Sequence, residues 1–237
     1  MTSVLIGEAE GFRSVMQDLS ANMVREINDA LRGTGHLTER VQRDTMMEIY
    51  PDIWMPHAAT AVDLSQAWYQ ASAPEIAVNV VTLLMPTPQT IAGQVAWAFT
   101  QHAMHHALLA AAQRDLWNEA RRTIAANADK EEGATWARHA SANACRFCQT
   151  LATRGPVYAS KKSAEQDHDS RKFLGLSRET YHKHCHCVAV PVRPGKSYEP
   201  PAYVEKWTED YEKAAKMSPT RDMKSVMAAY RQMDSEK

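Results

Sequence analysis

The chain has 237 residues, of which 44% are apolar and 23% charged, so it is long enough to bury a core and has the composition of a globular protein. No run of 18 apolar residues occurs and the first twenty residues contain both acidic and basic side chains, so we expect neither a membrane span nor a signal peptide. The net charge of −1 is unevenly distributed: residues 1–130 hold nine Lys and Arg against fourteen Asp and Glu, whereas residues 131–196 hold eleven against six. The basic excess of the second segment suits an acidic partner such as nucleic acid.

The first 71 residues are predicted to be helical. From residue 4 to 31 there is no proline and apolar residues recur every three or four positions, which predicts an amphipathic helix that ends near Gly33. A second helix is predicted over 37–49, ending before Pro51, and a third over 52–71. Together these elements predict a helical hairpin or a small bundle.

The next segment, 75–85 (EIAVNVVTLLM), is rich in β-branched residues and lies between Pro74 and Pro86. This composition favours an extended crossing segment over a helix. Thr87 and Pro88 then supply a helix start, and the apolar stripe that follows predicts one helix of roughly 37 residues. We expect this helix to be the longest element and the spine of its domain.

The pattern changes at residue 131. Short apolar runs at 155–158 and 187–192 alternate with polar and basic stretches, which predicts a small α+β module over 131–196. Beyond it, aromatic residues and methionines at helical spacing predict a tail of two short amphipathic helices over 197–237, packed on the body or offered to a partner. The predicted fold is therefore mainly α, with an N-terminal helical domain at 1–130.

All four cysteines lie in the α+β module as two close pairs, Cys145 with Cys148 and Cys185 with Cys187. Such close pairing is typical of a chelate rather than of a disulfide framework, so we expect synthesis in a reducing cytoplasm. A C-x2-C turn presents two thiolates to one metal ion, and an i, i+2 pair entering a strand points both side chains to one face. The two pairs can therefore complete one tetrahedral site.

Soft thiolates favour zinc over magnesium or calcium, so the predicted cofactor is a zinc ion that stabilises the α+β module. The predicted ligands are the four cysteines, with His182 as the alternative fourth ligand in place of one of the last two. A closed four-ligand site is structural, because it leaves no open position for activating water. The competing interpretation is that these residues are unliganded thiols in a loop.

No catalytic residue is assigned from the sequence. Neither G-x-S-x-G nor H-E-x-x-H occurs. His139, Ser141, His168 and Asp169 can be assembled into a hypothetical triad, but most chains of this length allow such a combination. The pair at residues 102 and 106 on the predicted long helix has chelating spacing without an acidic partner beside it, so no metal is assigned there.

Basic residues surround the cysteines and could contact nucleic-acid phosphates independently of sequence, or could form an ordinary solvated surface. The candidates for phosphate contact are Arg146, Arg154, Lys161, Lys162, Arg171, Lys172 and Lys183.

Two motifs resemble a known family. NACRFCQTLATRGPVYASKKSA, followed by YHKHCHCVAVPV, resembles the C-x2-C and H-x2-C-x-C signature of the MuF-like minor head proteins of tailed bacteriophages, especially those of the phages of actinobacteria. AVDLSQAWYQ, RRTIAANADKEEGATWARHA and the tail PPAYVEKWTEDYEKA are also similar to that branch. By position, the motif residues of the family fall on Cys145, Cys148, His182, Cys185 and Cys187.

The resemblance implies a minor capsid protein that assists head assembly, acts structurally, and is built into the head interior near the portal after assembly in the host cytoplasm. Its implied partners are the portal protein, a scaffold or major capsid protein, and packaged DNA without sequence preference, with no membrane. Members of this branch are also often labelled capsid maturation proteases that process scaffold or capsid protein, and this activity is the alternative function.

Overall fold

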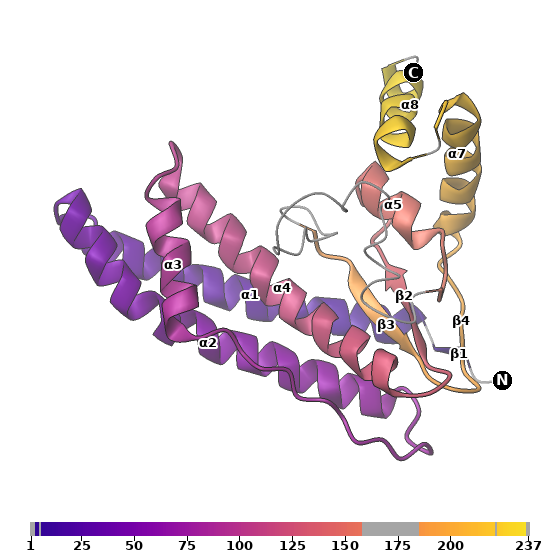
Figure 1. Ribbon diagram of the computed structural model, residues 1–237, viewed down its shortest axis with the longest axis horizontal. Helices are drawn as coiled ribbons and strands as arrows, with labels where there is room; N and C mark the ends of the chain where they lie inside the picture. Colours follow the sequence, from indigo (N-terminus) through magenta and orange to yellow (C-terminus); the bar gives the residue numbers. More distant parts are fainter. Residues whose placement is uncertain (1–2, 5, 158–184, 221, 236–237) are drawn as a thin grey trace. The chain divides into compact units, whose positions relative to one another are not determined.

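The computed structural model describes residues 3–4, 6–157, 185–220 and 222–235 (Figure 1). In chain order the elements are β1 Ser3–Val4, α1 Ile6–Thr34, α2 Glu39–Ala71, α3 Pro88–Ala98, α4 Met104–Lys130, β2 Thr135–His139, α5 Arg146–Ala152, β3 Val188–Val192, β4 Ser197–Tyr198, α7 Tyr203–Met217 and α8 Met223–Ser235. The predicted fold class, mainly α with a small sheet component, is confirmed. No helix in these ranges is long and apolar enough to cross a membrane.

The chain divides into two compact units. One contains Gly11–Ile124 and the described part of Tyr181–His186. The other contains the described parts of Met1–Glu10, Ala125–Thr180 and Cys187–Lys237. Apart from Cys185 and His186, the described part of the predicted α+β module therefore shares the second unit with the helical tail.

Helix α1 follows the predicted amphipathic pattern. Met16, Met23 and Ile27 are fully buried at spacings of seven and four residues, so one stripe of the helix faces the core. Near its C-terminal end, the hydroxyl of Thr34 donates to the carbonyl of Leu31 at 3.3 Å. This bond satisfies a carbonyl of the last turn.

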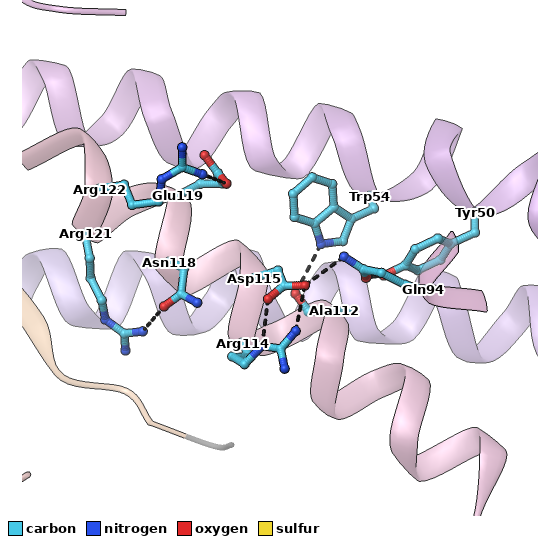
Figure 2. Close-up of polar contacts among 10 residues, drawn as sticks. All are labelled: Tyr50, Trp54, Gln94, Ala112, Arg114, Asp115, Asn118, Glu119, Arg121 and Arg122. Carbon is cyan, nitrogen blue, oxygen red and sulfur yellow. Dashed lines mark hydrogen bonds and ion pairs between the residues drawn. The ribbon is translucent and has the colours of Figure 1, made fainter. Parts of the chain in front are cut away.

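Helix α2 contradicts the prediction of two helices separated at Pro51. It is one helix that contains both Pro51 and Pro56. Each proline removes one backbone hydrogen bond, which normally kinks or ends a helix. Here Tyr50 and Trp54 are fully buried on the same helix, and the Trp54 indole donates to the carbonyl of Ala112 at 3.1 Å (Figure 2). Burial of these large side chains offsets the lost backbone bonds.

Residues 77–87 lie outside every helix and strand of the described chain, in agreement with the predicted extended segment. Helix α3 begins as predicted, because Pro88 occupies the first turn and the Thr87 hydroxyl accepts from the backbone N–H of Thr90 at 3.3 Å.

The predicted 37-residue helix is wrong, because it is interrupted at 99–103. The N–H and the hydroxyl of Thr100 both donate to the carbonyl of Trp97, at 3.0 and 2.7 Å. Helix α3 therefore ends in a tight turn, in which a backbone bond to residue i−3 and a side-chain bond replace the regular helical bond. His102 lies in this turn and His106 on α4, so the pair does not share a helix face.

A partly buried chain of polar side chains joins the helices of the first unit (Figure 2). The Tyr50 hydroxyl donates to Oε1 of Gln94 at 2.8 Å, and Nε2 of Gln94 donates to Oδ2 of Asp115 at 2.7 Å. Arg114 forms an ion pair with Asp115, with Nε and Oδ1 2.7 Å apart. Burial, with a smaller contribution from the Asp115 charge, raises the pKa of Tyr50 well above its ordinary value, so the hydroxyl keeps the proton it donates.

A Tyr50→Phe variant is expected to lose about 1 kcal/mol of unfolding free energy, because the carbonyl oxygen of the Gln94 side chain then loses its donor inside the helical unit. Denaturant unfolding followed by circular dichroism measures the loss. Tyr211→Phe removes a hydroxyl from a half-buried side chain of α7 and is the matched control, with an expected change under about 0.5 kcal/mol. Equal effects of the two substitutions would contradict a special role for the polar chain.

The second unit contains two pairs of short strands. Strands β2 and β3 are antiparallel, with Thr135 opposite Val192 and His139 opposite Val188, whereas β1 and β4 are parallel. The predicted apolar run at 187–192 is therefore a strand, but residues 155–157 belong to none, and residue 158 lies outside the described chain.

At the end of β3, Arg193 forms an ion pair with Glu131, with Nε 2.5 Å from Oε2 and Nη2 2.8 Å from Oε1. The Arg193 side chain is fully buried and that of Glu131 is 11% exposed. The two-point geometry orients the guanidinium, so the pair connects the end of β3 with the turn after α4.

The two predicted tail helices are present as α7 and α8, which we call the C-terminal helix pair. Ala214 of α7 is fully buried, and Val226, Ala229 and Tyr230 of α8 are almost so. These residues form one hydrophobic cluster, which is the expected result of packing two amphipathic helices on one another.

Candidate metal centre

The first cysteine pair lies at the start of α5. Cys145 is the residue before the helix, with φ −66° and ψ 159°, and its carbonyl accepts from the N–H of Gln149 at 2.9 Å. Cys148 lies within the first turn of α5 and is 2% exposed, whereas Cys145 is exposed. The helix start thus buries one thiol of the C-x2-C motif and leaves the other at the surface.

The second pair directly precedes β3. Cys185 and Cys187 are each 4% exposed, and Sγ of Cys187 is 3.4 Å from Sγ of Cys148. The sulfur atoms of Cys148, Cys185 and Cys187 all lie within 4.8 Å of one another. Cys185 is two residues from Cys187, so chain connectivity restricts it to this neighbourhood.

These distances suit thiolates that share a metal ion. Two sulfurs bound to one tetrahedral zinc ion at about 2.3 Å lie about 3.8 Å apart. A disulfide would hold them at about 2 Å, and none joins the four cysteines, all of which the structure describes. A buried group of three cysteines can therefore hold a metal ion, and thiolate ligands select a soft or borderline one.

Among the described residues, no fourth cysteine, histidine or carboxylate belongs to this group. Cys145, one predicted ligand, is exposed and lies outside the three-sulfur cluster. His182, the predicted alternative, lies outside the described residues. The structure thus brings three of the five predicted ligands together.

Sequence reasoning did not identify two buried arginines next to the cysteines. Nη2 of Arg121 on α4 donates to the carbonyl of Cys185 at 2.5 Å, and Nη1 of the same side chain donates to Oδ1 of Asn118 at 3.0 Å. Figure 2 shows the second of these contacts. Nη1 of Arg138 on β2 lies 3.9 Å from Sγ of Cys187. The signal in the sequence was the charged Arg138 after the apolar pair WA of the segment TWARH, which forms β2. In the structure this arginine is 1% exposed.

His186, between the two cysteines, is held by an aromatic contact. Its ring stacks on that of Trp117, with centroids 5.1 Å apart and planes inclined by 27°. The guanidinium of Arg121 lies over the same indole, 5.6 Å from its centroid. These contacts orient the chain that carries Cys185.

A family comparison covers this centre. The model of the VG15 protein family matches residues 6–214, which is most of the chain. The chain belongs to the VG15 family. This family is phage-associated, so the protein is a phage protein. The match does not extend to the narrower MuF-like minor capsid assignment, which stays a prediction. No curated protein and no solved structure matches the chain.

The residues of the hypothetical triad make other contacts in this VG15 chain. His139 is fully buried, with Nε2 2.8 Å from Oε1 of Glu10 and Nδ1 3.0 Å from the hydroxyl of Tyr198. Burial, then the charges of Tyr203 and Glu10, raise the pKa of Tyr198. The hydroxyl of Ser141 donates to Oδ1 of Asn143 at 2.8 Å.

A catalytic nucleophile and its base must form a hydrogen bond with one another. The hydroxyl of Ser141 donates to Asn143 instead, and the two ring nitrogens of His139 contact Glu10 and Tyr198. His168 and Asp169 lie outside the described residues. The described part of the chain therefore gives the hypothetical triad no geometric support.

The predicted phosphate-binding residues divide into three groups. Arg146 forms ion pairs with Asp210 and Asp234, which gives its guanidinium a role within the protein. Arg154 is exposed after α5 and has the access that a phosphate contact needs. The remaining candidates, Lys161, Lys162, Arg171, Lys172 and Lys183, lie outside the described residues.

Proposed function

We propose that this VG15 family member is a MuF-like minor capsid protein that acts in head assembly and is structural rather than catalytic. The observation that carries the proposal is the buried group of Cys148, Cys185 and Cys187, which joins the two halves of the motif within the family-matched range. Buried thiolates that converge from two distant segments can cross-link a fold through a metal ion. Such a group does not itself supply a catalytic base.

The metal that we propose is zinc. The three cysteines would provide three tetrahedral positions, and Cys145 or His182 would provide the fourth. A zinc ion in this site would hold α5 against the start of β3, since Cys148 belongs to the first and Cys187 precedes the second.

The proposed partners are the portal protein and a scaffold or major capsid protein, and the proposed location is the head interior near the portal. Arg154 and the basic residues of the segment between the cysteine pairs would contact packaged DNA without sequence preference. These proposals draw on the phage family and on the resemblance of the motif to minor head proteins.

The decisive experiment is quantitative mass spectrometry of purified phage heads and procapsids, from the parent phage and from a phage with a stop codon early in this gene. A minor capsid protein is expected in heads at a few copies per portal, and its loss should reduce the yield of filled heads. Absence of the protein from both particles would contradict the proposal. Co-expression with scaffold and capsid proteins tests the protease alternative, because specific trimming of their termini would establish an enzyme.

A further inference from the structure

A buried arginine contacts the sulfur of a predicted metal ligand. Arg138 lies in β2, is 1% exposed, and has Nη1 3.9 Å from Sγ of Cys187. The strand register accounts for the contact. Arg138 is opposite Ala189 on β3, and positions 187 and 189 lie on the same face because side chains alternate along a strand. The pairing of β2 with β3 therefore delivers this guanidinium to the cysteine.

The charges of the two groups are complementary. An arginine side chain stays protonated in proteins, and its burial is unfavourable unless a negative group compensates the charge. A zinc ion bound by three thiolates carries one net negative charge, and a fourth thiolate adds another. A zinc centre at the cysteine group and the Arg138 guanidinium would thus each reduce the cost of burying the other.

We propose that Arg138 is an outer-sphere residue of the metal centre: it donates an N–H···S hydrogen bond to the metal-bound sulfur of Cys187 and compensates the negative charge of the centre. The inference rests on the proposed zinc site. Arg121 has a different part, because its Nη2 donates to the carbonyl oxygen of Cys185 at 2.5 Å. It positions the backbone, whereas Arg138 acts on the ligand atom.

The test uses the full-length protein loaded with Co²⁺, whose thiolate-to-cobalt charge-transfer band reports on the sulfur atoms. Arg138→Met keeps most of the side-chain length and removes both the donor and the charge. We expect this variant to bind Co²⁺ and Zn²⁺ about 10- to 100-fold more weakly in chelator competition. We also expect its charge-transfer band to move to lower energy, because a lost N–H···S bond raises the energy of the sulfur electrons.

Arg231→Met is the matched control, since it removes the same charge from an exposed position of α8. Its band and its affinity are expected to equal those of the parent protein. Arg138→Lys keeps the charge and replaces the planar donor. It should bind metal within about tenfold of the parent affinity, with a displaced band.

The outcomes separate this inference from the zinc proposal. If the parent protein binds no Co²⁺, the zinc site itself is wrong. If the parent binds Co²⁺ and a folded Arg138→Met variant keeps the parent band and affinity, only the role of Arg138 is wrong. If Arg138→Met does not fold, Arg138→Lys decides, because a band and an affinity both identical to those of the parent would overturn the inference.

Discussion

Replacing Cys187 by serine is expected to remove the bound metal and to lower the free energy of unfolding by about 4 kcal/mol or more. A serine hydroxyl is a poor zinc ligand, and the variant leaves the buried sulfur of Cys148 without the neighbour that lies 3.4 Å away. Metal content per chain and thermal unfolding with and without a chelator provide the measurements. Hydrogen exchange should show lost protection in α5, β2 and β3, with α2 unchanged.

Val190→Thr is the control for this variant, because it places a hydroxyl in the fully buried interior of β3 and leaves every thiol in place. It should destabilise the protein without reducing its metal content. Less than about half an equivalent of zinc in the parent protein, or unfolding that chelation does not change, would contradict a structural metal.

The same measurements identify the fourth ligand. Cys145→Ser and His182→Asn each remove one candidate, and the substitution that removes the true ligand should change the cobalt spectrum and weaken zinc binding. Because Cys145 is exposed, its replacement is not expected to disturb the core.

Elements whose formation depends on local signals were predictable from the sequence. The apolar spacing of α1, the Thr87 and Pro88 start of α3, and the amphipathic patterns of α7 and α8 all act within a few residues. The two cysteine pairs were also informative, because three of their four thiols lie in one buried group that could hold a metal ion.

Features set by tertiary contacts were not predictable in this way. Pro51 lies within α2 because the neighbouring side chains of that helix are buried. Their burial depends on tertiary contacts, whereas the sequence rule for proline considers only the local backbone. The end of α3 depends on bonds that Thr100 makes to Trp97, although the apolar stripe continues through it. Arg138 reaches Cys187 through the pairing of two strands that are distant in sequence, so a pattern of types and spacings does not reveal the contact.

Arg146→Met is expected to detach α8 from α5 locally and to accelerate hydrogen exchange in α8 about 30-fold, or about 2 kcal/mol. Arg146 stands between Cys145 and Cys148 in the motif, and it connects α5 with both members of the C-terminal helix pair. Its Nη1 is 2.9 Å from Oδ2 of Asp210 on α7, and its Nη2 is 2.6 Å from Oδ1 of Asp234 on α8. The hydrogen bond with Asp234 is the largest cause of the raised pKa of Arg146.

The expected loss lies between the values for exposed and buried ion pairs, because the Arg146 side chain is 23% exposed and those of Asp210 and Asp234 are 10% and 42% exposed. Its guanidinium also lies over the ring of Tyr230, 4.9 Å from the centroid. Arg231→Met removes the same charge from an exposed position of α8 and should leave exchange unchanged.

The double variant Arg146→Met with Asp210→Asn should recover part of the loss, because an uncompensated carboxylate at a nearly buried position is a main cost of the single change. Unchanged protection of α8 in Arg146→Met would mean that the apolar cluster alone holds the helix pair. Faster exchange confined to α7 and α8 would instead establish that the cysteine motif anchors a segment extending beyond the family-matched range, which ends at residue 214. The arginine of the motif would then have an architectural role independent of nucleic acid.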